Sequence, residues 1–457
     1  MNRFASLPLL GALLALPIAA QDFQPRMGEP LSGLTQEQLT RFEAGKAEYL
    51  AVLSEADGLG PIFNDSGCAQ CHSTPAVGGF STRNVTRFAK AANGGQPFDP
   101  LADLGGSLLQ STGLSSLPTV LWEQIPAEAD VIIGRNTPHV FGAGLVEAIE
   151  DADFVANELD PRDNGIVKWV APLEGGAPRP GRFGWKADVP TVLHFSADAS
   201  LNELGLTNRF LTEENAPNGN QATLDTYDTV ADPEDSTVPG TGRIDRQTDF
   251  QRLLAPPPQT PKTGMAGEAI FTSIGCATCH HPSYTTGSSP EAGLSGVEIR
   301  PYSDFLLHDM GSLGDGIVSG TATERLMMTR PLWGISLRQS FLHDGRATGS
   351  TFVGNLDSTI QFHDGEAASS RNAFNGLTQA EQDALFAFLG SLGRAEFDLE
   401  HNNRVDFFDW ALLEPNFTGP APAQPLTPDD DGAIGDIDQD ADFDLRDFLI
   451  FQRAYTG

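Results

Sequence analysis

Two short cysteine motifs constrain this chain most, because each one fixes a large planar group that the surrounding fold must enclose. The motifs are Cys68-Ala69-Gln70-Cys71-His72 and Cys276-Ala277-Thr278-Cys279-His280. Two thiols one helical turn apart can bond both vinyl groups of one porphyrin, and the adjacent imidazole can then reach the iron. The sequence therefore predicts two covalently bound haem c groups, attached through these cysteines, with His72 and His280 as the proximal iron ligands.

A zinc site is the alternative interpretation of paired cysteines. A structural zinc ion takes four ligands, so one Cys-x-x-Cys pair would need a second ligand pair beside it. Here each pair carries its own histidine, and the two motifs lie far apart in the chain. They also use all four cysteines, which leaves no thiol for a disulfide framework. Two haems fit the pattern better than zinc does.

The amino-terminal residues predict export. A short basic start that includes Arg3 precedes an apolar run, which closes on the small residues Ala19 and Ala20. This order is typical of a secretory signal peptide, and the run is too short to span a membrane. We therefore expect residues 1–20 to be a signal peptide. The mature chain should be periplasmic or secreted, without a membrane span.

The charge balance limits the partners of the mature chain. The formal net charge is −33, from 61 acidic and 28 basic residues. A chain this acidic is repelled by nucleic acid and by anionic membranes. The excess of acid could serve solubility alone, or it could steer a basic electron donor. Charge does not separate these two interpretations.

Composition and pattern predict a mainly α-helical fold with long irregular loops. The 48 glycines and 32 prolines indicate many loops. Capping boxes at Thr35 and Thr378 predict two amphipathic helices, and Leu385 and Leu389 lie on the apolar side of the second. We expect two small cytochrome c-like haem domains with little strand.

An internal repeat indicates a duplicated haem domain. The spacing Phe-x-x-x-Gly-Cys-Ala-x-Cys-His begins once at Phe63 and again at Phe271. The expected units are a signal peptide at 1–20, a first haem domain at 21–262, a second haem domain at 263–394, and an EF-hand or dockerin-like α-helical tail at 395–457.

Several further motifs, in order along the chain, resemble one known family. They are Asp57-Gly58-Leu59-Gly60-Pro61-Ile62-Phe63-Asn64, Gly181-Arg182-Phe183-Gly184-Trp185-Lys186-Ala187, Leu307-His308-Asp309-Met310-Gly311 and Leu342-His343-Asp344-Gly345-Arg346-Ala347. Residues from about Leu34 to Arg394 resemble the di-haem oxidoreductase family, also labelled thiol oxidoreductases. That family is similar to bacterial di-haem cytochrome c peroxidases and to the di-haem enzyme that matures tryptophan tryptophylquinone. With no spare cysteine, nothing in the chain supports thiol chemistry.

The resemblance implies a second axial ligand for one haem. In the related peroxidases, the far ligand of the second haem lies downstream of a His-Asp-Gly motif, and His363 lies in the corresponding segment here. Met310 and His308 are the rivals, because the Leu-His-Asp-Met-Gly segment also suits an axial ligand. His363 could instead be a surface histidine. A low-spin electron-transfer haem needs such a sixth ligand, whereas a catalytic haem leaves that side open.

The resemblance also implies an acid–base group beside the open haem. Cleaving the O–O bond of a peroxide requires a proton moved from one oxygen to the other. Related enzymes place a glutamate between the two haem motifs, and Glu203 lies in a similar segment. We expect Glu203 to be the catalytic acid, His194 to be its pocket partner and Trp185 to relay electrons between the haems. Glu147 is a rival acid, and Trp185 could be an ordinary core residue.

The segment after Arg394 has the ligand spacing of two EF-hand calcium loops, with oxygens at loop positions 1, 3, 5, 7 and 12. The matching residues are Asp398, Glu400, Asn402, Arg404 and Asp409 in the first loop, and Asp436, Asp438, Asp440, Asp442 and Asp447 in the second. The seventh ligand is usually a backbone carbonyl. The spacing resembles dockerin type I repeats, although Asn403 and Ala441 replace the glycine at position 6. A solvated acidic tail is the alternative.

The motifs favour an exported, peroxidase-like di-haem oxidoreductase. Hydrogen peroxide or O2 would react at the first haem, and an external electron donor would supply electrons through the second. One alternative is a non-catalytic electron carrier with two six-coordinate irons, and another is a di-haem oxygenase of the rubber-oxygenase type. A third hypothesis makes the tail primary, as a module that binds a cohesin-like or cell-surface partner.

Overall fold

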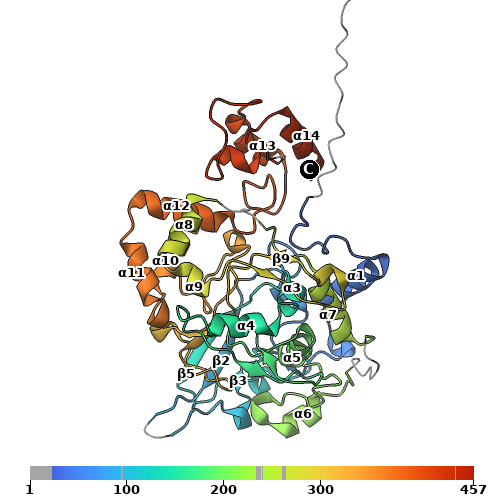
Figure 1. Cartoon of the computed structure of the whole chain (residues 1–457). Coiled ribbons are helices and arrows are strands. Elements are labelled where there is room, and N and C mark those ends of the chain that lie inside the picture. The colour runs from blue at the N-terminus through green and yellow to red at the C-terminus, as the bar shows by residue number, and fades with distance from the viewer. Residues whose placement is uncertain are drawn as a thin grey trace, which may run out of the picture.

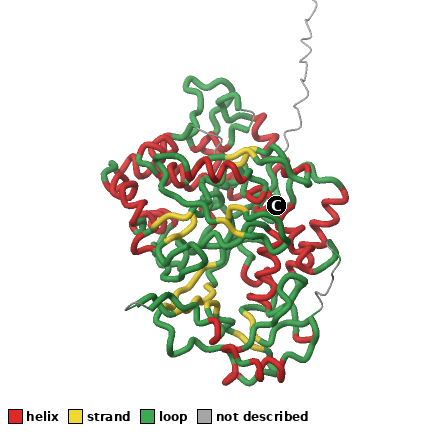
Figure 2. Tube along the Cα trace, turned by 60° about the horizontal axis from the view of Figure 1, so that its bottom comes forward, coloured by secondary structure: helices red, strands yellow, loops and turns green. Residues whose placement is uncertain are grey.

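The computed structural model describes residues 23–93, 96–232, 238, 240–259, 264–437 and 439–456. Loops and turns connect short helices and strands throughout the main body (Figure 2). Within the described ranges, no helix has both the length and the apolar character needed to cross a membrane. The predicted signal peptide at 1–20 lies outside the described residues.

The described chain up to residue 253 forms seven α-helices. They are α1 (Gln36–Leu50), α2 (Cys68–Cys71), α3 (Ala143–Glu147), α4 (Asp151–Glu158), α5 (Val192–Leu204), α6 (Gln221–Tyr227) and α7 (Arg243–Leu253). The predicted capping box begins α1, where Thr35 and Gln38 each bond the backbone of the other. α1 packs against α7, with the rings of Phe42 and Phe250 5.4 Å apart, and α7 packs against α5. α1 also contacts α2, so this helix group supports the first cysteine motif.

A three-stranded antiparallel sheet with the order β3-β2-β5 lies in the same half. β2 (Asn84–Ala89) pairs with β5 (Val131–Asn136) along its whole length and with β3 (Ser107–Leu108) over two residues. β5 starts with the β-branched run Val-Ile-Ile, which fits a pleated strand well.

The remaining strands of the described chain form two-stranded antiparallel ribbons. They are β1 (Ile62–Phe63) with β4 (Thr112–Gly113), β6 (Trp169–Val170) with β7 (Arg179–Pro180), β8 (Tyr284–Thr285) with β9 (Glu298–Ile299), and β10 (Leu307–Asp309) with β11 (Leu326–Met328). Each ribbon is two or three residues long, so each one fixes a loop rather than building a layer.

The prediction of a mainly α-helical, cytochrome c-like fold is wrong. The structure is 36% helical and 11% strand, with several small sheets. These strands lie among loops rich in glycine and proline, and most are too short for an alternating pattern to appear in the sequence. The main body is a mixed α and β structure with much irregular chain.

Five helices contain or lie beside the second cysteine motif, on the side of the body opposite α1 and α7 (Figure 1). They are α8 (Ala266–Ser273), α9 (Cys276–Cys279), α10 (Phe352–Gln361), α11 (Ala368–Asn375) and α12 (Gln379–Ser391). α12 begins at the predicted capping box of Thr378 and Glu381. Its apolar side packs against α8, and Leu385 and Leu389 are buried there, so the prediction of this helix is confirmed.

One hydrophobic core joins the two halves of the main body. It contains Leu145 and Phe154 from the first half, and Tyr284, Phe305 and Trp333 from the second. The halves therefore share buried apolar surface, which holds the two cysteine motifs in a fixed relation. The predicted boundary between residues 262 and 263 lies outside the described residues.

The carboxyl-terminal tail projects from the main body and contains α13 (Phe407–Leu413) and α14 (Leu445–Ala454) (Figure 1). It encloses a small core of its own, which includes Phe397, Phe443 and Phe451.

The amino-terminal segment ties this tail to the main body. The Asn403 side chain accepts a hydrogen bond from the Met27 N–H at 3.1 Å and donates one to the Met27 carbonyl at 3.0 Å. Met27 is itself buried in a core cluster with Phe42 and Phe250. The first predicted calcium loop is therefore connected to the helix group that supports the first cysteine motif.

Candidate functional site

The first motif forms a single helical turn that leaves its histidine prepared to bind a metal. The backbone N–H of His72 donates to the carbonyl of Cys68 at 2.9 Å, and its Nδ1–H donates to the carbonyl of Gly79 at 3.3 Å. Burial lowers the pKa of His72 to about 4, so the imidazole is neutral. With Nδ1 carrying the proton, the lone pair of Nε2 is left for a metal.

The second motif repeats this arrangement. The backbone N–H of His280 donates to the carbonyl of Cys276 at 2.9 Å, and its Nδ1–H donates to the carbonyl of Tyr302 at 3.0 Å. Burial lowers the pKa of His280 to about 4. Two sites far apart in sequence therefore present a neutral imidazole whose Nδ1–H is held by a backbone carbonyl.

The four cysteines of the motifs are free, neutral thiols. Burial raises the pKa of Cys68 and of Cys276 to about 12, and that of Cys71 to about 11. Burial also raises the pKa of Cys279. Neutral thiols are the form that each pair presents in the absence of a bound group.

A cavity of about 570 Å³ adjoins the second motif. Its wall contains Cys276, Cys279 and His280, and its apolar lining includes Phe341 and Leu356. This volume lies within the range of about 300–1,000 Å³ that cofactor pockets occupy. Two thiols, a free imidazole nitrogen and apolar walls are the set that a covalently attached haem requires.

Both predicted sixth ligands, His363 and Met310, line this same cavity. The Nδ1–H of His363 donates to the carbonyl of Thr359 at 2.9 Å, so its Nε2 is free, as in His280. Burial lowers the pKa of His363. Its charge also contributes to the lowered pKa of His280, which places the two imidazoles near each other. The hydrogen bond to Thr359 thus orients His363 for binding iron, whereas Met310 only lines the cavity.

The other rival, His308, has no nitrogen to offer. Its Nε2 lies 2.8 Å from a carboxylate oxygen of Asp304, and its Nδ1 lies 2.9 Å from one of Glu366. Burial alone lowers the pKa of His308, but hydrogen bonds to Asp304, Cys279 and Glu366 raise it far above its ordinary value. A protonated imidazole donates from both nitrogens and cannot bind iron.

The predicted acid, Glu203, lies against the first motif. It is at the end of α5, where its Oε2 accepts a hydrogen bond of 2.8 Å from the side chain of Asn64. Its backbone carbonyl also accepts from the Asn64 N–H at 2.9 Å. Burial raises the pKa of Glu203, and its charge in turn raises the pKa of Cys71. A half-buried, desolvated carboxyl group is therefore placed beside the attachment site of the first haem.

His194, the predicted pocket partner of Glu203, and Glu147, the rival acid, both lie near the other end of α5. His194 lies at the opposite end of α5, nine residues before Glu203, which is about 14 Å along a helix. Glu147 forms an ion pair with Arg252 at 2.6 Å and accepts from the N–H of Val192 at 2.8 Å. Glu147 thus connects α3, α5 and α7, and both of its oxygens are engaged.

Trp185 lies between the two sites. It lines the cavity of the second motif, and its Nε1–H donates to the carbonyl of Asn136 at 3.1 Å. Its ring contacts the ring of His343 edge to face, with centroids 6.2 Å apart, and the guanidinium of Arg330 lies 5.2 Å from it. The indole therefore connects the wall of the second cavity to the first half of the chain.

The sequence does not single out three arginines that lie at these sites. Arg87, on β2, lies near Glu203, where its charge opposes the rise in the carboxyl pKa. Its buried Nε has no hydrogen-bond partner among the described residues. Arg330 and Arg338 line the second cavity. No motif or spacing marks these residues, because only the fold reveals their surroundings.

The two tail loops have the same backbone conformation. Asp398 accepts from the N–H groups of Asn402 and Asn403 in the first, and Asp436 accepts from the N–H groups of Asp440 and Ala441 in the second. The residues at position 6, Asn403 and Ala441, have φ of 64° and 66°. That is the left-handed region in which EF-hand loops use glycine. The turn therefore forms without the missing glycine.

Each tail loop gathers three carboxylates whose oxygens lie within 4.8 Å of one another. The groups are Glu400, Asp406 and Asp409 in the first loop, and Asp442, Asp444 and Asp447 in the second. Burial raises the pKa of Asp398 to about 6, which indicates how poorly the first loop tolerates its charge without a cation. Asp440 contacts Arg446 at 3.1 Å, Arg404 donates its N–H to Asn402, and Asp438 lies outside the described residues.

Comparison with known proteins supports the interpretation of the main body. A family model described as "Di-haem oxidoreductase, putative peroxidase" matches residues 122–392, more than half of the chain. The match contains the second motif, His363, Glu203 and Trp185, and it begins after the first motif. No curated protein matches the chain.

Proposed function

Because the chain belongs to the di-haem oxidoreductase family, we propose that it is an exported c-type enzyme that reduces hydrogen peroxide to water. One haem c would be attached at the first motif with His72 as its proximal ligand. The other would be attached at the second motif between His280 and His363. An external donor would supply electrons through the second haem, and peroxide would react at the first.

The asymmetry between the two sites carries this proposal. The second cavity has two neutral imidazoles, His280 and His363, each with a free Nε2, which suits a six-coordinate electron-transfer haem. The first motif instead has the half-buried carboxyl group of Glu203 beside Cys71. A pure electron carrier has no use for a buried proton-transfer group.

Glu203 would carry the proton during peroxide reduction. Haem iron supplies the centre that binds peroxide and accepts electrons one at a time. Glu203 would take the proton from the bound peroxide and return it to the departing oxygen. Burial raises the pKa of Glu203, and the hydrogen bond from Asn64 fixes the direction of the carboxyl group. Two electrons and two further protons complete the conversion of one peroxide into two water molecules.

Trp185 would relay electrons between the sites. Its indole lies against His343 and Arg330 at the wall of the second cavity. Its Nε1 is bonded to Asn136, which ends β5 in the first half of the chain.

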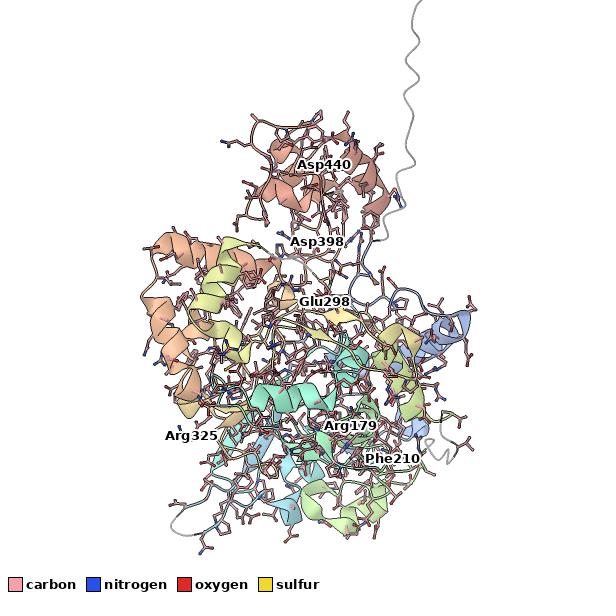
Figure 3. The ribbon with its side chains drawn as sticks, in the orientation of Figure 1. Arg179, Phe210, Glu298, Arg325, Asp398 and Asp440 are labelled. Atoms are coloured by element: carbon pink, nitrogen blue, oxygen red, sulfur yellow. The ribbon has the colours of Figure 1, made fainter. Side chains whose placement is uncertain are left out.

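The substitution Glu203→Gln tests the proposed activity. Glutamine keeps the shape and can still bond Asn64, but it cannot exchange a proton, so peroxide reduction should slow by about a hundredfold or more. The absorption spectra of both haems should be unchanged. Glu298→Gln, which removes an exposed carboxylate of β9 (Figure 3), is the matched control and should retain full activity. Normal turnover by the Glu203 variant would remove this residue from the mechanism.

The oxygenase alternative predicts a different readout. An oxygenase of the rubber-oxygenase type would consume O2 and cleave a carbon chain, with no need for an external electron donor. The peroxidase proposal predicts oxidation of a reduced donor in proportion to the peroxide added. If peroxide failed to oxidise the donor, and O2 was consumed when polyisoprene was added, the oxygenase alternative would be favoured.

A second proposal concerns the tail, which would bind two calcium ions and a cohesin-like or cell-surface partner. The shared loop conformation, with left-handed residues at position 6, supports the calcium sites. Large apolar side chains on α13 and α14 stay exposed, among them Phe407, Phe408 and Leu445. Large apolar side chains exposed on a small unit are candidates for a surface that a partner covers. Calorimetry of the mature chain should detect two calcium ions, and no heat at millimolar calcium would contradict the proposal.

A further inference from the structure

Two arginines lie deep in the main body, and neither has a carboxylate partner among the residues that the structure describes. Arg330 donates to the carbonyl of Gly184 at 3.3 Å, and Arg338 donates to the side-chain oxygen of Asn136 at 3.4 Å. The Nε of Arg338 is buried and has no hydrogen-bond partner among the described residues. Burial lowers the pKa of Arg330 to about 9 and that of Arg338 to about 10. Both cations are therefore held under conditions that penalise their charge.

This lack of a partner contrasts with three other deeply buried cations of the protein. Arg135 and Lys186 pair with Asp315, and Arg182 pairs with Asp151. Arg87, near Glu203, resembles Arg338 in having a buried Nε without a hydrogen-bond partner among the described residues. The chain has 61 acidic and only 28 basic residues, so carboxylates are in excess. An arginine that stays unpaired in such a chain indicates that its counter-ion comes from outside the chain.

The two guanidinium groups also lie near each other. The charge of Arg338 contributes to the lowered pKa of Arg330, which is repulsion between like charges. Each group is held over an aromatic ring, with Arg330 5.2 Å from the Trp185 centroid and Arg338 5.4 Å from that of Phe80. Phe80 belongs to the loop after the first motif, where it pairs with Thr74. The pair therefore lies at the junction between the two sites.

Both arginines line the cavity of the second motif. Each keeps part of its surface accessible although its surroundings desolvate it, as a side chain at a cavity wall does. An anion in that cavity could thus reach two guanidinium groups at once. The group that the proposed function places there is a haem, and every haem carries two propionate carboxylates.

We infer that Arg330 and Arg338 bind the propionates of the haem attached at Cys276 and Cys279, on the edge of that haem that faces the first motif. This inference rests on the proposed haem binding. Arginine suits the role because its planar fork donates two parallel hydrogen bonds to one carboxylate. The pairing removes the repulsion between the two cations and leaves each propionate ionised.

A positive charge beside a haem also sets its reduction potential. A cation stabilises the ferrous form over the ferric form, which carries one more positive charge. Removing one arginine leaves a propionate charge uncompensated and favours the ferric form. Each arginine thus acts as a positioning residue for the haem and raises the potential at which this haem accepts an electron.

The test is a redox titration of the holoprotein with Arg338→Gln, Arg330→Gln and the control Arg325→Gln. Arg325 lies at the outer edge of the body and pairs with Asp309 (Figure 3). Either glutamine variant at the cavity should lower the equilibrium constant for reduction of the low-spin haem at least tenfold, which is a shift of about 59 mV for one electron. The control should keep the parent potential.

The pH profile and a lysine variant separate charge from structure. In Arg338→Gln the potential should become pH-dependent near neutrality, because an unpaired buried carboxyl group takes up a proton more readily. Arg338→Lys keeps the charge and should recover most of the parent potential, even if the glutamine variant folds poorly. If Arg338→Gln and Arg330→Gln both kept the reduction potential of the parent, the inference would be overturned. It would also be overturned if the reduction potential of the parent changed with chloride concentration.

A haem count distinguishes this inference from the proposed function. Pyridine haemochrome assay of the parent should give two haems per chain, and the thioether bonds should keep both haems in every variant. Fewer than two haems in the parent would contradict the proposed function itself. Two haems with unchanged potentials would leave the proposed function standing and remove the arginines from the site.

Discussion

The side-chain amide of Asn64 donates a hydrogen bond of 2.8 Å to the carboxyl group of Glu203. Asn64 lies in the loop just before the first cysteine motif, and Glu203 lies at the end of α5. The bond therefore joins the attachment site of the first haem to the residue proposed to move the proton. It also opposes the burial that raises the pKa of Glu203.

The substitution Asn64→Ala should move the acid limb of the pH–activity profile to higher pH. The unprotonated carboxylate accepts the proton, so activity is lost as the pH falls through the pKa of Glu203. Loss of the Asn64 bond raises that pKa further, because this bond favours the charged form. Steady-state peroxide reduction over a range of pH is the measurement.

Ser111→Ala is the matched control for Asn64→Ala. The Ser111 hydroxyl donates to the Oδ1 of Asn64 at 3.3 Å and makes no contact that affects the charge of Glu203. Its acid limb should coincide with that of the parent. An acid limb that moves to lower pH in Asn64→Ala would contradict the role given to this bond.

The substitution His363→Ala should convert the second haem from low-spin to high-spin. The Nε2 of His363 is free and lies at the same cavity as His280, so its removal takes away the proposed sixth ligand. The ferric absorption spectrum reports the change directly. Met310→Leu keeps the apolar volume and should leave the haem low-spin. A low-spin spectrum in His363→Ala together with a high-spin spectrum in Met310→Leu would make Met310 the ligand.

The substitution Trp185→Phe should slow the passage of electrons between the haems. The indole and its hydrogen bond to Asn136 are lost while the aromatic contact with His343 is kept. Turnover should fall by about tenfold, equivalent to roughly 1.4 kcal/mol of barrier. Stopped-flow reduction of both haems is the measurement, and Trp169→Phe, on the half-exposed residue of β6, is the control. Equal rates in the Trp185 variant and the parent would exclude this relay.

Calcium should stabilise the mature chain against thermal unfolding of its tail. An ion that binds only the folded loops contributes about 2.7 kcal/mol when its concentration is a hundred times its dissociation constant. Asp447→Asn weakens the second loop, because this buried carboxylate closes the loop through the N–H groups of Ile437 and Asp444. Its calcium-dependent shift in Tm should be smaller than that of the parent. Asp225→Asn, at an exposed position of α6, should shift like the parent, and a chelator without effect on the parent would contradict the calcium sites.

Local sequence signals predicted the parts of the structure that depend on neighbouring residues. The capping boxes at Thr35 and Thr378 begin α1 and α12, because such a box satisfies backbone donors within one turn. The spacing of the two cysteine motifs places each histidine at the end of a helical turn. Family resemblance, rather than periodicity, led to His363 and Glu203.

Signals of this kind could not predict features that depend on distant parts of the chain. β2 and β5 were missed because strand pairing across residues 84 and 136 leaves no mark within either segment beyond a few β-branched residues. The sequence allows His308 as a ligand, but in the structure Asp304 and Glu366 occupy its two nitrogens. The lack of a carboxylate beside Arg330 or Arg338, among the described residues, likewise becomes visible only when the folded chain brings distant segments together.

The central claim is that one haem is open for peroxide while the other is closed by two axial ligands. Electron paramagnetic resonance of the ferric protein tests this claim most directly, because high-spin and low-spin ferric haems give separate signals. We predict one high-spin and one low-spin haem per chain, with the low-spin signal lost in His363→Ala. Two low-spin signals of equal intensity in the parent would contradict the account and indicate an electron carrier.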